Sequence, residues 1–140
     1  MFSSDHNNPD VFCSAWTGSI TANEMLEAYQ NFFKGPQWQK RSLEFADFSE
    51  ADLSQIKVPD LQKLCNIVAK FYQENGVSHA RCASWIPREI NRSLLEIYDF
   101  LSKQSPEVTR VFPNKGTAMA WLCSADEKTA QEFELNKGVV

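Results

Sequence analysis

Short apolar runs and longer amphipathic stretches alternate along the chain. The apolar runs are rich in aromatic and β-branched residues, which are typical of strands. Four strands are predicted, over Val11–Thr17, Leu43–Asp47, Ala80–Ile86 and Val108–Phe112. Each is followed by residues whose apolar positions recur at the spacing of one helix face. The alternation predicts an α/β domain of four βα units, with a mostly parallel sheet and right-handed crossovers.

The first predicted helix has both a start and a stop signal. Thr21, followed three residues later by Glu24, forms a capping box, in which each side chain accepts a hydrogen bond from the other residue's backbone N–H. Gly35 and Pro36 end the helix, because glycine favours a left-handed cap and proline cannot continue the hydrogen-bond ladder. The expected buried face consists of Met25, Leu26, Tyr29, Phe32 and Phe33.

The second and third predicted helices each open at a proline, Pro59 and Pro87, a residue that suits the first helical turn. The second helix has the strongest amphipathic pattern, with Lys63 and Lys70 on its polar side. Its expected buried stripe is Leu61, Leu64, Cys65, Val68, Ala69 and Tyr72. The third helix is expected to end at Ser105 and to bury Ile90, Leu94, Ile97, Tyr98 and Leu101.

The end of the chain predicts two further short helices. One follows Pro113-Asn114 and places Ala118, Trp121 and Leu122 on one side. Ser124 and Glu127 resemble a second capping box, which predicts a short extra C-terminal helix through about residue 135. The 140 residues then make one domain over 11–135, with a flexible lead-in over 1–10 and a frayed tail over 136–140.

Composition narrows the functional classes. The net charge of −4 and the pI near 5.2, without a cluster of Lys and Arg, argue against a nucleic-acid partner. No apolar run approaches the roughly 18 residues of a membrane span, and residues 1–10 lack the basic and apolar regions of a secretory signal. Cys13, Cys65, Cys82 and Cys123 form no C-x-x-C pair, so we expect four reduced thiols in the core of a cytoplasmic protein.

The sequence contains no motif of a known catalytic, cofactor or metal site. It has no G-x-S-x-G, Walker or dinucleotide-binding pattern. Its two histidines, His6 and His79, lack the spacing of metal ligands. Cys82 is three residues from His79, but it lies in mid-strand and is expected to point into the core as an inert thiol. We therefore predict neither a cofactor nor a metal.

Three segments carry a resemblance to a known family. They are GSITANE at 18–24, FADFS at 45–49, and VFP at 111–113 followed by AMAWL at 118–122. Together they resemble the SpoIIAA-like proteins, relatives of the STAS domains of anti-sigma-factor antagonists. The resemblance implies a four-turn superhelix of βα units. Phosphorylatable STAS domains carry a hydroxyl residue at a helix entry, but the matching segment here, IKVPDL at 56–61, has none, so no functional residue is transferred.

Polar residues follow three of the predicted strands, at the end of a parallel sheet where ligands are commonly bound. Leu43–Asp47 is expected to run into a polar turn at 48–50. The expected rim of the sheet consists of Asp47, Ser49, Trp85, Arg88, Asn114 and Lys115. Arg88 and Lys115, beside helix N-termini, could hold an anion. The alternative is that Asp47 and Ser49 only form turn and cap hydrogen bonds.

The missing reaction centre favours a non-catalytic role. With the resemblance, it predicts a regulatory or protein-interaction module that has a protein partner. The alternative is small-molecule or lipid binding in a pocket between sheet and helices, because lipid-carrying domains share this fold and the chain is rich in aromatic residues. An enzyme working from Asp47 or Cys82 is the third hypothesis. A homodimer through an edge strand or the first helix stays open, and Trp38 either forms an association surface or closes the end of that helix.

Overall fold

The computed structural model describes residues 1–5, 11–34, 43–77, 80–104 and 107–124. The strands are β1 (Phe2–Asp5), β2 (Val11–Ser19), β3 (Leu43–Asp52), β4 (Ala80–Trp85) and β5 (Glu107–Phe112). The helices are α1 (Ala22–Lys34), α2 (Val58–Glu74), α3 (Glu89–Leu101) and α4 (Lys115–Leu122), and a 3-10 turn, η2 (Ser102–Gln104), follows α3. These bounds fit the predicted alternation of strands and helices.

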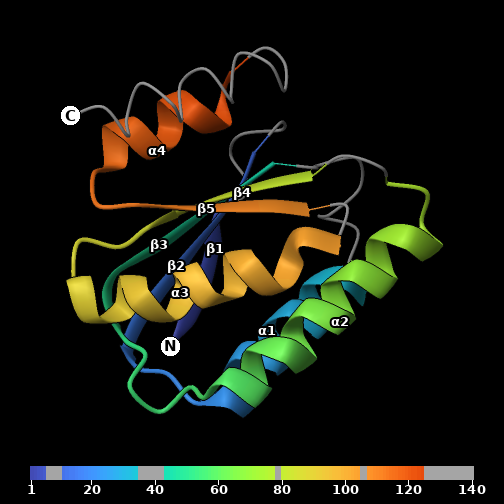
Figure 1. Ribbon diagram of the computed structural model, residues 1–140, viewed down its shortest axis with the longest axis horizontal. Coiled ribbons are helices and arrows are strands. Elements are labelled where there is room, and N and C mark those ends of the chain that lie inside the picture. Colours follow the sequence, from blue (N-terminus) through green and yellow to red (C-terminus); the bar gives the residue numbers. More distant parts are fainter. Residues whose placement is uncertain (6–10, 35–42, 78–79, 105–106, 125–140) are drawn as a thin grey trace.

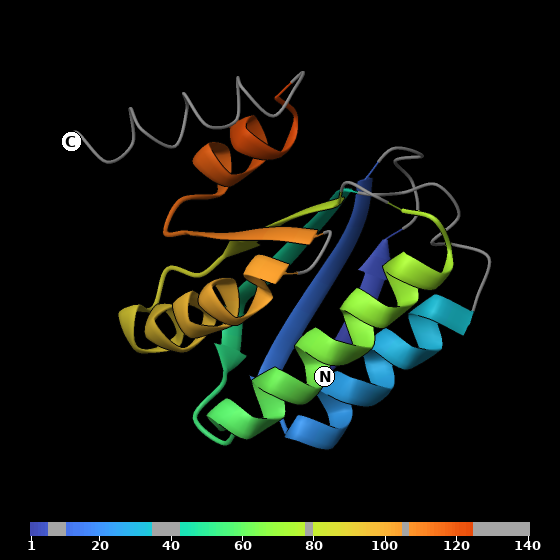
Figure 2. The ribbon, with the colours of Figure 1, turned by 45° about the vertical axis from the view of Figure 1, so that its right-hand side comes forward.

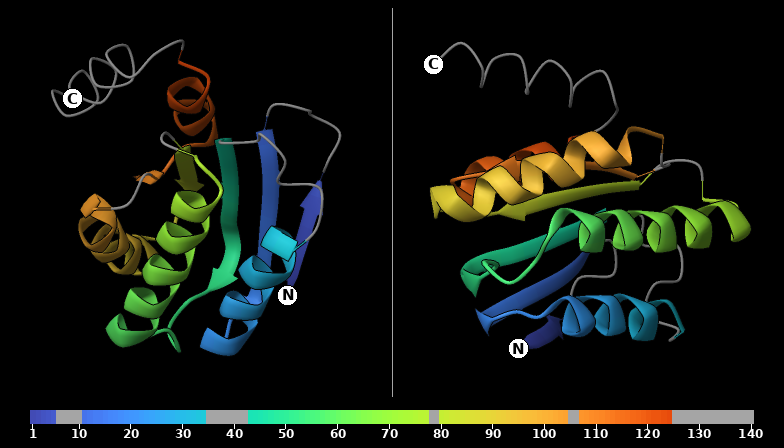
Figure 3. Two further views of the ribbon diagram at one scale, coloured as in Figure 1. Left: turned by 90° about the vertical axis from the view of Figure 1, so that its right-hand side faces the viewer. Right: turned by 60° about the horizontal axis from the view of Figure 1, so that its bottom comes forward.

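The five strands form one sheet in the order β1-β2-β3-β4-β5. Strands β2 to β5 are parallel to one another, and β1 pairs antiparallel with β2 at the edge (Figure 3). Right-handed crossovers between parallel neighbours return each connecting helix to the same face of the sheet. Helices α1, α2 and α3 accordingly cover one face, whereas α4, which follows the last strand, lies on the other (Figure 1). The predicted α/β fold with a mostly parallel sheet is confirmed.

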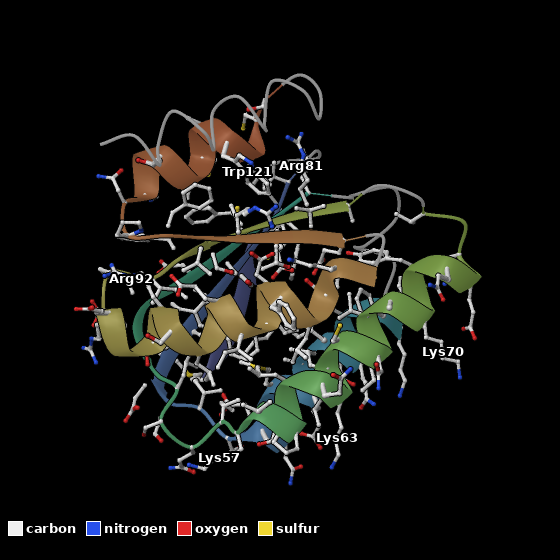
Figure 4. The ribbon with its side chains drawn as sticks, viewed as in Figure 1. Lys57, Lys63, Lys70, Arg81, Arg92 and Trp121 are labelled. Atoms are coloured by element: carbon white, nitrogen blue, oxygen red, sulfur yellow. The ribbon has the colours of Figure 1, made fainter. Side chains whose placement is uncertain are left out.

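Two hydrophobic cores lie on opposite faces of the sheet. The main core lies between the sheet and α1 to α3, where α1 and α2 run side by side (Figure 2). It contains Trp16, which is 1% exposed, and the predicted stripe of α2 is buried there apart from half-buried Ala69. Lys63 and Lys70 project from the outer side of α2, as its pattern predicts (Figure 4). The smaller α4 core consists of Val11, Phe45, Ala83, Phe112, Ala118, Trp121 and Leu122.

Arg81 fastens α4 to the sheet. Its Nη1 donates to the Trp121 carbonyl at 3.2 Å, and its Nη2 donates to the Ser124 carbonyl at 2.9 Å. The guanidinium also lies 5.7 Å from the centre of the Trp121 ring, between the sheet and the helix (Figure 4). Carbonyl groups at a helix C-terminus lack partners within the helix, and a cation there is favourable. Arg81 therefore supplies the C-terminal cap of α4 from a neighbouring strand.

Strand β1 corrects the predicted flexible lead-in over residues 1–10. Its register with β2 runs from Phe2 opposite Trp16 to Asp5 opposite Cys13. The rings of Phe2 and Trp16 pack with their centroids 4.7 Å apart. A short polar segment of this kind gains strand structure by pairing with an existing edge, which its own composition does not reveal.

The predicted polar turn at 48–50 is wrong. Strand β3 continues to Asp52, and β2 continues to Ser19 instead of ending at Thr17. In the register, Ala15 lies opposite Asp47 and Thr17 opposite Glu50, so β3 holds one extra residue. This is a β-bulge, which interrupts the ladder locally without ending the strand. The polar residues that predict a turn therefore occupy a bulge.

The buried face of α3 matches the prediction in part. The side chain of Ile90 lies outside the described part of the structure. Tyr98 is buried, and Leu94 and Leu101 pack against the main core, but Ile97 is 38% exposed and Leu95 is buried instead. The cause is Asn91, whose amide Nδ2 donates to the Ala51 carbonyl at 2.8 Å and whose Oδ1 accepts from the Leu53 N–H at 3.2 Å. These bonds turn the helix so that the buried positions are Asn91, Leu95, Tyr98 and Ser102. An apolar pattern cannot reveal a stripe that begins and ends with polar residues.

The four cysteines are free, but they are not all core residues. Cys65 and Cys82 are buried, Cys13 is half-buried and Cys123 is exposed at the end of α4, which corrects the prediction for Cys123. Some predictions fall on residues outside the described ranges. They concern His6, Gly35, Pro36, Trp38, His79, Ser105, Pro106, the helix through 135 and the tail at 136–140.

Candidate functional site

The predicted rim residues do not form one group. Trp85 lies opposite Asp47 in the register of β3 and β4, and the Lys115 Nζ lies 5.8 Å from the centre of the Trp85 ring. These three residues come from strands and from α4. Arg88 is the N-cap residue of α3, on the other face of the sheet. Hydrogen bonds from Ser54, and to a lesser extent the charge of Arg88, lower the pKa of Asp52. The structure thus brings Asp47, Trp85 and Lys115 together and places Arg88 apart.

Most hydrogen-bonding groups of this rim serve the backbone. The Asp47 Oδ1 accepts from the Ser49 N–H at 2.9 Å and from the Ser49 hydroxyl at 2.6 Å, within the bulge of β3. The Asn114 Oδ1 accepts from the Thr117 N–H at 3.1 Å and caps α4. This is the alternative anticipated from the sequence, in which the polar residues form turn and cap bonds. Ligand binding by the rim stays a prediction.

A second polar group lies inside the main core. Glu44, the second residue of β3, is only 7% exposed. Its Oε2 accepts from the Ser14 hydroxyl at 2.9 Å and from the Tyr29 hydroxyl at 2.8 Å. Cys82 lies opposite Glu44 in the register and is fully buried beside it. A carboxyl of the sheet is therefore held by hydroxyls of β2 and α1.

Glu107 is the second buried carboxyl, at the start of the edge strand β5. It is 6% exposed, and its Oε1 accepts from the Thr109 hydroxyl at 3.2 Å. The Tyr72 hydroxyl of α2 also hydrogen-bonds to Glu107. Thr109 lies opposite Cys82, which lies opposite Glu44, so the two carboxyls approach the same part of the core from β3 and β5. Three helices and four strands contribute polar groups to this region.

Burial controls the ionisation of this cluster. It raises the pKa of Glu44, and for Glu107 burial together with the Glu44 charge raises the pKa from 4.5 to about 8. Burial also raises the pKa values of Tyr29, Tyr72, Tyr98 and Cys82 well above their usual values. Glu107 thus changes charge near pH 8, where the raised pKa values of the tyrosines and of Cys82 keep those groups protonated. At neutral pH, the pair of carboxyls formed by Glu44 and Glu107 is therefore more stable with a proton bound.

Beside these groups lies a cavity with a volume of about 30 Å³. Its walls are formed by Met25, Tyr29, Phe48, Leu64, Cys82, Ser84, Leu95, Tyr98, Glu107 and Thr109. We call it the interior cavity. It has room for about two water molecules, and none for a lipid chain in this conformation. One part of the wall is aliphatic, another is aromatic, and a third carries hydroxyls and a carboxyl.

Tyr98 is the wall residue whose polar end stays available. The residue is 6% exposed and lines the interior cavity. Among the hydrogen bonds of the described residues, none uses the Tyr98 hydroxyl. Tyr29 differs, because its hydroxyl already donates to Glu44. Among the described side chains, the fully buried polar atom without a partner is the Trp16 Nε1, and the Tyr98 hydroxyl is a further polar group that can contact a molecule in the cavity.

The motifs of the sequence did not predict this site, although one signal for it exists. In a sheet covered on both faces, the side chains of a central strand are buried on both sides. A glutamate within such a strand, such as Glu44 between Leu43 and Phe45, is then a buried carboxyl that needs partners. Glu107, by contrast, lies just before the predicted fourth strand and looks like a loop residue in the sequence. Its burial follows from the tertiary structure alone.

The structure also bears on the other predicted site classes. Cys82 is buried with a raised pKa, as expected of an inert core thiol. Within the described ranges, no group of three His, Cys, Asp or Glu side chains could hold a metal ion. Nor is any described helix long and apolar enough to cross a membrane.

Comparison with known proteins identifies the architecture. No protein-family model and no curated protein matches the chain. The chain is similar to the crystal structure of an uncharacterized protein from the DUF3478 family with a SpoIIAA-like fold, from Shewanella loihica PV-4. The two share 18% sequence identity with a TM-score of 0.53, over 88% of this chain and 93% of the other. The order of strands and this similarity together show that the chain has a SpoIIAA-like fold.

Proposed function

We propose that this protein is a binding module that receives the polar group of a small molecule in the interior cavity. The observation that carries the proposal is Tyr98, a residue of the cavity wall that is 6% exposed and whose hydroxyl is used by none of the hydrogen bonds of the described residues. Ligand sites of this kind combine apolar walls with a few polar groups that fix orientation. The cavity has the same composition, because its lining includes Leu64 and Leu95 as well as Ser84 and Glu107.

Two features favour binding over catalysis at this site. The Cys82 thiol is a weak nucleophile, because a raised pKa keeps it protonated. The Glu44 carboxyl is already engaged by Ser14 and Tyr29, so its oxygens have little freedom to move a proton to a substrate. The small volume favours the small-molecule form of the binding hypothesis over the lipid form, which would require the helices to separate from the sheet.

Native mass spectrometry of the gently purified protein tests the proposal. We expect an added mass that disappears on denaturation, and we expect Tyr98→Phe to retain less of it. A ligand-observed NMR screen of small alcohols, amides, amines and acids covers a ligand that is lost on purification. A bare chain of 16.0 kDa, together with no binder in this screen, would refute the proposal.

A protein-interaction role is the second candidate, and a different observation favours it. Phe100, on the outer side of α3, is 68% exposed, and Ile97 of the same helix is 38% exposed. Large apolar side chains that gather on a surface often mark contact sites. For this candidate we propose a second copy of the chain as the partner. Light scattering of the wild type and of Phe100→Ser tests it, since a monomeric wild type at high concentration would contradict the self-association.

The cytoplasmic location expected from the sequence stays part of the proposal. It is supported by the four free cysteines, because thiols stay reduced in that compartment. Fractionation of cells that express the tagged full chain would test it.

A further inference from the structure

The chemistry of the cavity wall narrows the class of ligand. Three aromatic rings, those of Tyr29, Phe48 and Tyr98, line the interior cavity together with the carboxyl of Glu107. The face of an aromatic ring attracts cations, and a carboxyl supplies a charged hydrogen-bond acceptor. Cages of aromatic rings with a carboxyl are suited to ammonium groups. An ammonium group therefore uses both features of this wall.

We propose that the interior cavity binds a small primary ammonium group. Its nitrogen donates hydrogen bonds to Glu107 and to the Tyr98 hydroxyl oxygen, and its first carbon packs against Leu64 and Leu95. The inference rests on the proposed function and names the ligand class for the same cavity. A primary ammonium with one carbon contains two heavy atoms, and the cavity of about 30 Å³ has room for about two water molecules.

The acidic environment supports a cationic ligand rather than an anionic one. Glu44 lies opposite Cys82 in the register of β3 and β4, in the same part of the core. The hydroxyls of Ser14 and Tyr29, which donate hydrogen bonds to it, are uncharged. An anion would meet two carboxyls there. An ammonium group instead favours the charged form of Glu107, which otherwise holds a proton at neutral pH. Binding therefore releases a proton from Glu107 to the solvent.

Proton release gives the proposal a distinctive pH dependence. The titratable groups that face Glu107 are Glu44 of β3, Cys65 of α2, Cys82 of β4 and the tyrosines Tyr29, Tyr72 and Tyr98 of the three helices. The two thiols and the tyrosines stay protonated up to pH 8, because their pKa values are raised. As the pH rises toward 8, the affinity for the ammonium should increase by up to about tenfold per pH unit.

The experiment is a titration of the full chain with methylammonium chloride, followed by two-dimensional NMR of the backbone amides. Tetramethylammonium chloride, which exceeds the size of the cavity, and sodium chloride serve as controls at equal concentration. We expect saturable shifts at cavity residues with methylammonium alone, and tighter binding at pH 8 than at pH 6. Tyr98→Phe should weaken binding about tenfold, the effect of one hydrogen bond to a charged group. Glu107→Gln should abolish it, whereas Glu89→Gln, on the exposed start of α3, should change nothing.

Each outcome decides between the two proposals. If methylammonium acts no differently from the two control salts, the ammonium inference is overturned. If ethanol or acetamide then binds in a manner sensitive to Tyr98→Phe, the small-molecule function survives without it. If no probe binds, both proposals fail. Spectra of the variants show whether each is folded, and Tyr98→Phe, which removes a single unpaired hydroxyl, preserves the test if Glu107→Gln unfolds.

Discussion

Replacing Glu107 by glutamine should change how the stability of the protein depends on pH. In the folded protein the pKa of Glu107 is about 8, against an ordinary value of 4.5. At pH values between these two, the unfolded chain has released the proton that the folded protein keeps. Folding must then take up a proton, so the free energy of unfolding falls as pH rises. Below 4.5 and above about 8, this carboxyl causes no further change.

The structure sets the expected magnitude. One proton gives a slope of about 1.4 kcal/mol per pH unit, which amounts to about 5 kcal/mol across the whole interval. The glutamine amide removes this dependence but buries two N–H donors, which costs about 1–3 kcal/mol if they find no partner. At pH 8, Glu107→Gln should therefore be more stable than the wild type by about 2–4 kcal/mol. Glu44 remains in the variant and keeps its own dependence, since its pKa is also raised.

Urea unfolding followed by circular dichroism, at one-unit steps from pH 5 to pH 9, measures both profiles. The wild type should lose stability steadily up to about pH 8 and then level off. The exposed Glu89→Gln variant should follow the wild type and controls for the change in net charge. A wild-type profile that is flat from pH 5 to pH 8, or a Glu107→Gln profile with the same slope, would show that the buried carboxyl does not titrate as argued.

Three further substitutions test other contacts of the fold. Asn91→Ala should destabilise the protein by about 2–4 kcal/mol in urea unfolding, because it leaves two buried backbone groups at the end of β3 without partners; a loss below 0.5 kcal/mol would contradict this. Arg81→Met should cost about 1–2 kcal/mol by removing the cap of α4, with Arg88→Met as the exposed-arginine comparison. Phe100→Ser should change the midpoint of thermal unfolding of dilute protein by little, since the ring is 68% exposed, and a large loss would show that the ring is covered.

Local signals in the sequence predicted much of the architecture. The capping pair at the start of α1 is present in part, because the Glu24 N–H donates to the Thr21 hydroxyl oxygen at 3.1 Å. The apolar stripe of α2 and the burial of Trp16 and Trp121 also follow the pattern of the sequence. These features depend on residues a few positions apart, and helical periodicity and caps report them directly.

Features that depend on distant partners were not predictable in the same way. The pairing of Phe2 with Trp16 creates β1, and the bonds from Asn91 to the end of β3 set the rotation of α3. The interior cavity is assembled from α1, α2, α3 and three strands, so no single segment shows it. The acidic character of Glu44 was visible, but its burial depends on sheet coverage on both faces. Tertiary context decides each of these cases.

The sheet separates the protein into two cores of unequal size, and this has a consequence for how the molecule opens. The α4 core shares no buried side chain with the main core. Arg81 of the sheet donates hydrogen bonds to the backbone carbonyls at the end of α4. Detachment of α4 would uncover Phe45, Ala83 and Phe112 while α1 to α3 stay in place. Opening on that face loses only the contacts of the smaller α4 core. The backbone amides of α4 should therefore exchange with deuterium through local unfolding, faster than the amides of α2.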